Sequence, residues 1–279
     1  MKFFKKFLYV MGAAVIILIL SNIIYCNRAL EITNYKLSSD KLKTNFRIAL
    51  ISDQHNKQFG KNDRKLVQKI SEQKPDIIAV VGDIVTDNFA NDEVMKNLLV
   101  QLAQIAPTYY CLGNHERNLA SQIDFKTDIE NCGAVLLDNE SIEIKKSGES
   151  VLLGGLSDYP FYDFNEGNDD VPEKIFWYDF CGKVKNQYSI LLHHQPEYIY
   201  DMISSSPVDL VLCGHTHGGL IRIPFIGGLF APNQGFFPKY DKGEFDINNT
   251  KMIITSGLGN SNFLPRINNC PEICIIDIN

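Results

Sequence analysis

The chain has 279 residues and a formal net charge of −6, with 45% hydrophobic and 22% charged residues. This composition excludes a disordered chain and predicts an ordered globular protein with a sizeable core. The acidic balance gives no basic surface for nucleic acid, so a nucleic-acid partner is not expected. Seven cysteines are scattered along the chain, several of them in apolar runs. We therefore expect buried thiols rather than a framework of disulfides.

The N-terminus differs in character from the rest of the chain. Three lysines among the first six residues precede an uncharged run over residues 7–25. As a helix rising about 1.5 Å per residue, this run is about 28 Å long, close to the hydrocarbon thickness of a bilayer. A cleaved signal peptide is the alternative, but no pair of small residues marks a cleavage site. We predict an uncleaved single-pass membrane anchor over residues 1–27, with the rest of the chain outside the cytoplasm.

Residues 28–45 are polar and are predicted to form a linker to one domain over residues 46–279. Apolar runs and helical stripes predict alternating elements in the first part of this domain: strand 46–52, helix 64–72, strand 77–81, helix 94–105, strand 108–112 and helix 123–131. The later part predicts strands without helices between them: 134–137, 141–145, 151–156, 188–192, 210–213, 220–223, 252–255 and 273–278. We expect a single α/β domain with mixed sheets and helices outside.

All six histidines of the chain stand near the carboxyl ends of predicted strands, together with two aspartates and an asparagine. These groups are Asp53 with His55, Asp83, Asn114 with His115, His193 with His194, and His215 with His217. Such strand ends converge on one cleft in an α/β sheet. Nitrogen and oxygen donors without thiolate suit manganese, iron or zinc. The donors overfill one site, so we expect two metal ions, with Asp83 as the natural bridging carboxylate.

In their order along the chain, these groups resemble the motifs of the calcineurin-like metallophosphoesterase superfamily: D-x-H, G-D, G-N-H-[DE], H and G-H-x-H. The resemblance covers residues 46–279. With the N-terminal span, the segment 214–219 and the late Pro265-Arg266 and Pro271-Glu272-Ile273, the chain is similar to a subgroup of membrane-anchored bacterial phosphoesterases. The resemblance implies an α/β fold, a four-layer αββα sandwich of two mixed sheets flanked by helices.

The resemblance also implies roles for individual residues. One metal would be held by Asp53, His55, Asp83 and His217. The other would be held by Asp83, Asn114, His194 and His215. His194 is preferred to His193 because the family's histidine commonly stands two residues before a proline, here Pro196. His115 would bind no metal, and would stabilise the developing charge or protonate the leaving oxygen.

Two arginines, Arg266 and Arg222, are candidate phosphate contacts, because a guanidinium fork matches phosphate geometry. Two positions depart from the family pattern. Glu116 stands where aspartate is commoner, and its longer arm would alter how His115 is oriented. Leu220 follows Gly218-Gly219 where glutamine is frequent, so no substrate contact is carried over to it.

The implied function is hydrolysis of a phosphate ester or pyrophosphate bond by in-line attack of a metal-bridging hydroxide. A non-catalytic metal-binding receptor on the same fold is the alternative, although the ligand set is complete. The substrate is expected to be a phosphorylated small molecule or a lipid or cell-envelope phosphate, and the anchor favours the latter. We expect the protein to be a monomer. Specificity is expected in the loops 158–170 and 225–240, of which the second is rich in Phe, Gly and Pro.

Overall fold

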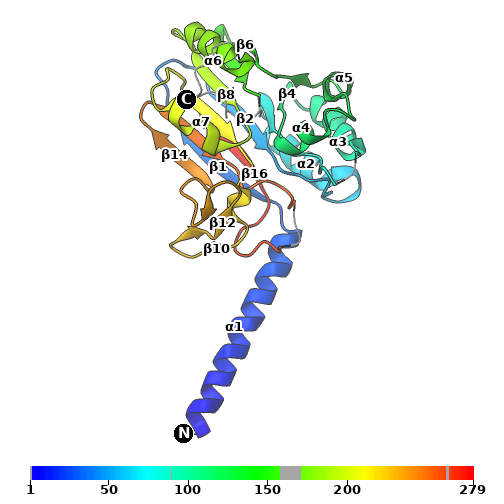
Figure 1. Ribbon diagram of the computed structural model, residues 1–279, viewed down its shortest axis with the longest axis vertical. Coiled ribbons are helices and arrows are strands. Elements are labelled where there is room, and N and C mark those ends of the chain that lie inside the picture. Colours follow the sequence, from blue (N-terminus) through cyan, green and yellow to red (C-terminus); the bar gives the residue numbers. More distant parts are fainter. Residues whose placement is uncertain (1, 89, 158–170, 262–263) are drawn as a thin grey trace.

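The computed structural model describes residues 2–88, 90–157, 171–261 and 264–279, so the predicted specificity loop 158–170 lies outside the described residues. Helix α1 (Lys2–Arg28) projects from one end of an otherwise rounded domain (Figure 1). The most apolar 18-residue window within residues 3–28 has a mean hydropathy of 2.5, and none of that window is buried. By length and composition, α1 is therefore able to cross a membrane.

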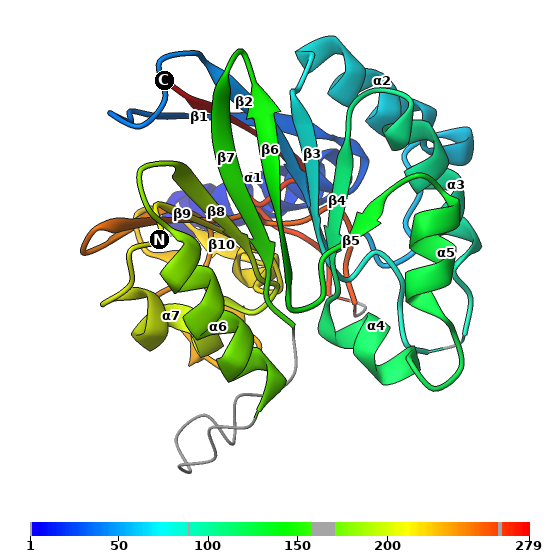
Figure 2. The ribbon, with the colours of Figure 1, turned by 90° about the horizontal axis from the view of Figure 1, so that it is seen from above.

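One six-stranded sheet carries the first half of the domain. Its strands, in spatial order, are β1 (Glu31–Leu37), β16 (Glu272–Ile278), β2 (Phe46–Ile51), β3 (Ile77–Val81), β4 (Thr108–Cys111) and β5 (Val135–Leu136). All neighbours pair in parallel except β16 and β2. Three helices follow strands of this sheet and cover its outer face (Figure 2): α2 (Arg64–Gln73), α3 (Glu93–Ala103) and α5 (Phe125–Asn131). The short helices η1 (Lys61–Asp63) and α4 (Asn114–Leu119) complete this half.

A second six-stranded sheet carries the later part of the chain. Its order is β14 (Gly243–Ile247), β15 (Thr250–Ile254), β9 (Leu210–Cys213), β8 (Tyr188–Leu192), β7 (Glu149–Gly155) and β6 (Glu140–Lys146). The outermost pair at each edge is antiparallel and the inner pairs are parallel. Helices α6 (Pro172–Lys183) and α7 (Pro196–Ile203) cover its outer face. Between β9 and β14 lie η3 (His217–Gly219) and two small hairpins, β10 (Arg222–Ile223) with β11 (Gly227–Gly228) and β12 (Phe230–Ala231) with β13 (Gly235–Phe236).

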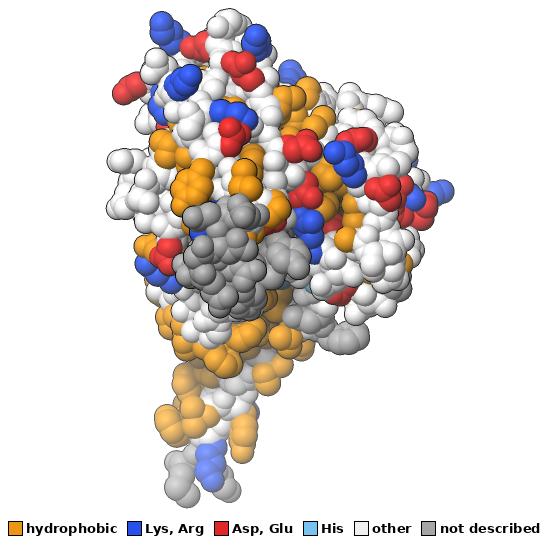
Figure 3. All heavy atoms as spheres, turned by 45° about the horizontal axis from the view of Figure 1, so that its top comes forward, with side chains coloured by type: hydrophobic (Ala, Val, Ile, Leu, Met, Phe, Trp, Pro, Cys, Tyr) orange, Lys and Arg blue, Asp and Glu red, His pale blue; other side chains and the backbone are white. Residues whose placement is uncertain are grey.

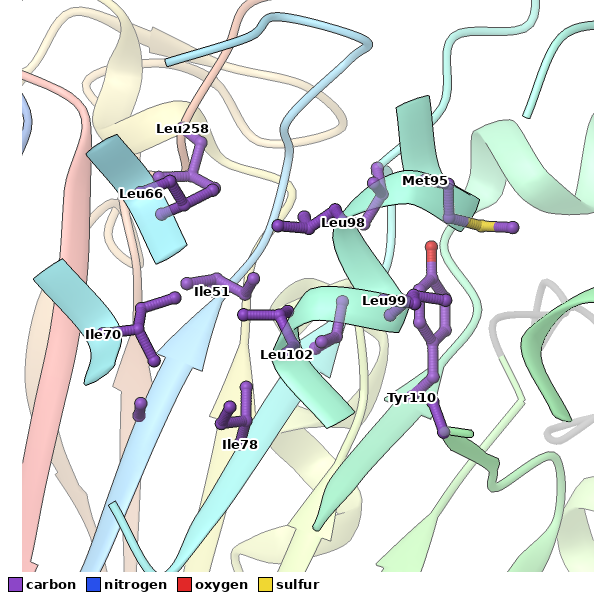
Figure 4. Close-up of a cluster of buried hydrophobic side chains, with 14 of the residues drawn as sticks. Ile51, Leu66, Ile70, Ile78, Met95, Leu98, Leu99, Leu102, Tyr110 and Leu258 are labelled. Atoms are coloured by element: carbon purple, nitrogen blue, oxygen red, sulfur yellow. The ribbon is translucent and has the colours of Figure 1, made fainter. Parts of the chain in front are cut away.

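Three apolar layers hold these parts together. The first packs α2, α3 and α5 on the first sheet, where Leu66, Leu98 and Leu102 meet strand residues such as Ile51 and Ile78 (Figure 4). The second lies between the two sheets, and the third joins the second sheet to α6 and α7. Strands buried on both faces explain the continuous apolar runs in the sequence. The four-layer αββα sandwich of mixed sheets is confirmed.

The later strands do not follow one another without helices, so this prediction was wrong. Helices α6 and α7 separate β7, β8 and β9. Helix α6 gives little helical signal because apolar side chains surround it: Phe176, Trp177 and Phe180 are buried, whereas Ile175 and Tyr178 are exposed. Both helices begin with a proline, which favours the first turn of a helix and was not used as a signal.

Two further expectations need correction. The segment predicted as a linker contains β1, an edge strand that pairs along its whole length with β16. Polar residues dominate β1 because one face of this edge is open to solvent. Cys111, Cys213 and Cys274 are buried as predicted, but Cys26 and Cys270 form a disulfide. These two cysteines are 244 residues apart in the sequence, so only the folded chain reveals their proximity.

Candidate metal centre

The polar groups singled out by the sequence meet where the two sheets lie face to face. Asp53, Asp83 and Asn114 follow β2, β3 and β4 of the first sheet. His194 and His215 follow β8 and β9 of the second sheet. The carboxyl ends of these five strands therefore form one cluster, contributed by both halves of the domain.

Three groups of side chains bring ligand atoms within 4.8 Å of one another, and one of them joins His55 and Asp83 to His115, which the sequence analysis expected to bind no metal. In the first, Asp53, His55 and His217 place one donor atom each within 4.8 Å of the others. The Nε2 atoms of His55 and His217 are 3.3 Å apart, and His217 Nε2 lies 3.7 Å from Asp53 Oδ1. All three side chains are buried. This geometry suits a small cation held by one carboxylate and two imidazoles.

The second group contains Asp83, His194 and His215, again with donor atoms within 4.8 Å of one another. His194 Nε2 lies 3.1 Å from Asp83 Oδ2, and the same carboxylate oxygen lies 3.9 Å from His55 Nε2 in the first group. Asp83 thus faces both groups. Asn114 stands beside the second group, where its Oδ1 accepts a hydrogen bond of 3.3 Å from Gln195 Nε2.

Five of the candidate ligands have left-handed backbone conformations. Their φ angles are 52° for Asp53, 48° for His55, 54° for Asp83, 68° for His215 and 49° for His217. For residues other than glycine this region costs about 1–2 kcal/mol each. Such strain gathers at functional sites and persists only where the surroundings fix the backbone.

Two motif glycines explain how the backbone is fixed around the carboxylates. A Cβ atom on Gly113 would collide with Asp83, and one on Gly214 would collide with Ser52 and Asp53. Because these glycines let the chain approach closely, the next peptide groups reach the carboxylates. His115 N–H donates to Asp83 Oδ1 at 2.9 Å, and His215 N–H donates to both oxygens of Asp53 at 3.1 Å.

The electrostatics of the cluster favour the protonation states that bind metal. Burial lowers the pKa of His55 to about 4 and that of His217 to about 3, so both imidazoles are neutral near pH 7. Burial alone would raise the pKa of Asp83, but His194, by its charge and its hydrogen bond, outweighs burial and holds that pKa well below its usual value. Ionised carboxylates and neutral imidazoles are the forms that donate lone pairs to a cation.

His115 stands at the edge of this cluster and is more exposed than the other histidines in it. Its Nδ1 lies 2.8 Å from Asp87 Oδ1 and 3.1 Å from the backbone nitrogen of Asp87. Its Nε2 lies 3.8 Å from Asp83 Oδ2. Asp87 therefore orients the ring with Nε2 directed at the cluster. The sequence analysis did not single out Asp87, although it follows Asp83 by only four residues.

Glu116 holds the first-sheet half of the centre together. It is fully buried, and its Oε2 accepts the N–H groups of Asp83 at 2.8 Å and Gly113 at 2.9 Å. Its Oε1 accepts the N–H of Ile84 at 2.8 Å and the Tyr110 hydroxyl at 2.7 Å. The longer arm of glutamate therefore fixes the loop after β3 against the start of α4. Its effect on His115 is indirect, through these two segments.

Further polar residues that the sequence analysis missed surround His215. Its Nε2 lies 3.3 Å from Glu197 Oε1 and 3.4 Å from both Gln195 Nε2 and Asn233 Nδ2. Gln195 and Glu197 follow His194 closely in sequence, which was an available signal. Asn233 comes from the turn between β12 and β13 and had none.

The two predicted arginine contacts have other partners in this structure. Arg266 is fully buried: its Nη2 donates to the carbonyls of Ser256 and Gly259 at 2.6 Å and lies 3.5 Å from His217 Nδ1. Arg222 donates from Nη1 to Asp241 Oδ2 at 2.8 Å. His193 is buried, with its Nδ1 at 3.2 Å from the carbonyl of Leu156.

Residues 46–219, more than half of the chain, match the calcineurin-like phosphoesterase family. The chain belongs to this family. It is accordingly a hydrolase of phosphoric ester bonds, and the family's use of divalent metals agrees with the clustered donors. This phosphoesterase is 29% identical over 214 residues to the phosphodiesterase YaeI of Escherichia coli K12, covering 74% of this chain and 72% of that one.

A further relative supports the same membership. An uncharacterized metallophosphoesterase of Aquifex aeolicus is 30% identical over 260 residues, covering 89% of this phosphoesterase and 92% of the relative. Among solved structures, a dimetal phosphatase from Danio rerio aligns with a TM-score of 0.44 at 13% identity, covering 76% of this chain and 87% of that chain.

Proposed function

We propose that the chain is a membrane-anchored phosphoesterase that uses two divalent cations to hydrolyse a phosphate ester or pyrophosphate bond by in-line attack. One observation carries this proposal: two groups of buried ligand atoms lie side by side, with Asp83 facing both. One cation would be held by Asp53, His55, Asp83 and His217. The other would be held by Asp83, Asn114, His194 and His215.

The donor chemistry fits such cations. The set contains two carboxylates, one amide oxygen and four imidazoles, with no thiolate, which suits manganese, iron or zinc. When bound, the cations would neutralise phosphate oxygens and lower the pKa of a water held between them. His115 Nε2, which faces the cluster, would hold or deliver a proton at the leaving oxygen. Asp87 keeps the His115 ring in the orientation that this step needs.

The two arginines take different roles in this proposal from those expected of them. Arg266 positions His217, since its donors bind backbone carbonyls around that ligand and its guanidinium is buried. Arg222 secures the hairpin β10–β11 through Asp241. Neither guanidinium is assigned to the phosphate.

The location follows from α1 and its surroundings. A helix of this length and hydropathy is a suitable single-pass anchor, and three lysines at its N-terminus favour that end in the cytoplasm. A disulfide between Cys26 and Cys270 is typical of the oxidising side of a membrane. We propose that the catalytic domain is extracytoplasmic and monomeric, and that its substrate is a phosphorylated small molecule or an envelope or lipid phosphate.

The test uses the full chain in detergent with Mn²⁺, assayed on a chromogenic phosphodiester, because the relative from Escherichia coli is named a phosphodiesterase. Asp83→Asn and His115→Ala should each lower kcat by about a hundredfold or more. Asp246→Asn is the matched control, since Asp246 is exposed on β14, and it should keep full activity. Full activity of Asp83→Asn would refute the assignment.

A second experiment addresses the alternative of a metal-binding receptor. The same preparation is analysed for bound metal and assayed on monoesters, diesters, sugar nucleotides and phospholipids. Stoichiometric metal without turnover of any of these substrates would support the receptor, and turnover of one of them would identify the substrate class.

A further inference from the structure

The two hairpins between η3 and β14 carry an unusual number of exposed aromatic side chains. All exposed phenylalanines that the structure describes outside α1 lie here: Phe225, Phe230, Phe236 and Phe237. Phe225, at the tip of β10–β11, is 109% exposed, and Ile226 beside it is also exposed. We call the segment 222–237 the phenylalanine hairpins. Apolar surface gathered on so few residues marks an interaction site rather than ordinary scatter.

Two phenylalanines of these hairpins have a backbone conformation that is unfavourable for an aromatic residue. Phe225 and Phe237 have φ angles of 68° and 55°, in the left-handed region that glycine or asparagine occupies more readily. A bulky aromatic residue there gains nothing from the domain's own core, because its side chain is exposed. Polar contacts nevertheless fix the base of the hairpins: Asp241 Oδ2 accepts Gly228 N–H at 2.6 Å and Arg222 Nη1 at 2.8 Å. The structure thus presents an apolar tip on β10–β11 and exposed aromatic side chains on and after β12–β13, above a base held by polar contacts.

The hairpins lie at the end of the domain from which α1 leaves (Figure 1), and hydrophobic side chains gather on this end of the surface (Figure 3). A short chain of contacts joins the two. Asn22 Oδ1, inside the apolar helix, accepts Asn268 N–H at 2.6 Å, and Asn268 Nδ2 donates to the carbonyl of Arg222 at 3.3 Å. The disulfide of Cys26 with Cys270 secures the same junction.

From these observations we infer that the phenylalanine hairpins insert into the surface of the lipid bilayer that α1 crosses. Asn22 lies six residues before the end of α1, about 9 Å along the helix axis. The domain therefore begins at the depth where the apolar span ends, which brings the exposed aromatic side chains of the hairpins to the interfacial layer. The bilayer surrounds the proposed anchor and so lies next to the hairpins, whereas the net charge of −6 does not favour a purely electrostatic attachment.

The docked hairpins would also set the distance of the metal centre from the bilayer. Asn233, in the turn between Phe230 and Phe236, donates to Glu197 Oε1 at 2.8 Å and lies 3.4 Å from His215 Nε2. Phe230 and Phe236 are direct cross-strand partners with rings 5.5 Å apart. The turn of this hairpin thus contacts the centre, and its two strands carry the exposed aromatic side chains. This part of the inference rests on the proposed function.

The experiment places the full chain in phosphatidylcholine vesicles, with or without bromine on the acyl chains, and measures tryptophan quenching. The parent contains one tryptophan, Trp177, buried on α6 at the far end of the domain. Phe236→Trp adds an emitter on the hairpins, and Tyr178→Trp adds a matched one on α6, where Tyr178 is 63% exposed. We expect brominated lipid to remove most of the emission added by Phe236→Trp and none added by Tyr178→Trp.

The measurement needs no turnover, so failure of the proposed phosphoesterase activity would leave its outcome unaffected. Phe225→Trp repeats the test at the second hairpin and guards against misfolding of one variant. Equal quenching at Tyr178→Trp, or no quenching at either hairpin position, would overturn the inference. Absence of quenching with a blue-shifted emission and a dimer on gel filtration would assign the face to a second copy of the chain instead.

Discussion

Glu116 offers the sharpest single test of how the centre is built. Its two carboxylate oxygens accept hydrogen bonds from the backbone of Asp83, Gly113 and Ile84 and from the Tyr110 hydroxyl. All of these groups act as donors toward Glu116. Glutamine has the same size and shape, so Glu116→Gln opens no cavity, but it replaces one acceptor oxygen with an NH₂ group. Whichever way the amide is turned, that NH₂ group faces buried N–H donors.

The size of the destabilisation follows from the number of buried donors that lose their acceptor. With the NH₂ group on the Oε2 side, Asp83 N–H and Gly113 N–H lose their partner. On the Oε1 side, Ile84 N–H and Val85 N–H lose their partner and the Tyr110 hydroxyl must rotate. A buried donor without an acceptor costs about 1–3 kcal/mol, so we expect Glu116→Gln to destabilise the domain by about 2–4 kcal/mol. For a domain of this size, that lowers Tm by about 4–15 °C.

Thermal unfolding of the full chain in detergent and excess chelator measures this change without a contribution from bound metal. Glu130→Gln is the matched control, because Glu130 is exposed on α5 and its replacement removes the same charge. Burial and the nearby Asp83 raise the pKa of Glu116, so the alternative to an ionised Glu116 is a protonated carboxylic acid. A Glu116→Gln variant as stable as Glu130→Gln would refute the reasoning, since glutamine would then mimic a carboxylic acid.

Three further predictions use other parts of the molecule. The chelated chain should lose stability as the pH falls from about 6.5 toward 4. In the folded chain, burial lowers the pKa values of His55 and His217 to about 4 and about 3, so both stay neutral, whereas histidines of the unfolded chain take up protons near pH 6.5. Urea unfolding midpoints at several pH values measure this change, and midpoints that do not vary with pH would contradict it. Without reductant, peptide mapping should recover the peptides of Cys26 and Cys270 joined, a product that Cys270→Ser abolishes. The triple replacement of Phe225, Phe236 and Phe237 by serine should lower turnover of a vesicle-borne phosphodiester by about tenfold, equivalent to a loss of about 1.4 kcal/mol in membrane-binding free energy. Turnover of a soluble chromogenic diester should be unaffected, and an equal loss on both substrates would point to damage at the centre.

More of the candidate metal centre than of the surrounding fold could be predicted from the sequence. The clustering of Asp53, Asp83 and His215 was predictable, because these residue types can hold a metal ion and stand directly after apolar runs that form buried strands. Their supporting residues left weaker signals. Glu116 was noted for its departure from the family pattern, but its hydrogen bonds depend on a loop and a helix that approach one another only in the fold.

The misses have a common physical origin in contacts between distant segments. β1 was read as a linker because its polar residues suit an edge strand, whose pairing with β16 is set by tertiary structure. The disulfide of Cys26 with Cys270 likewise follows from the docking of α1 on the loop before β16. The loop 225–240 was expected to contribute to specificity, but the exposure of its phenylalanines could not be predicted from its composition.

The left-handed ligands connect stability to function. Asp53, His55, Asp83, His215 and His217 together cost about 5–10 kcal/mol in backbone strain, comparable with the whole stability of a typical domain. The fold offsets that cost through the close approach of Gly113 and Gly214 to the carboxylates and through Glu116, rather than through the ligands themselves. A centre held in this way is rigid before any cation arrives. Binding energy from the cations is then available to the chemistry instead of being consumed in ordering the ligands.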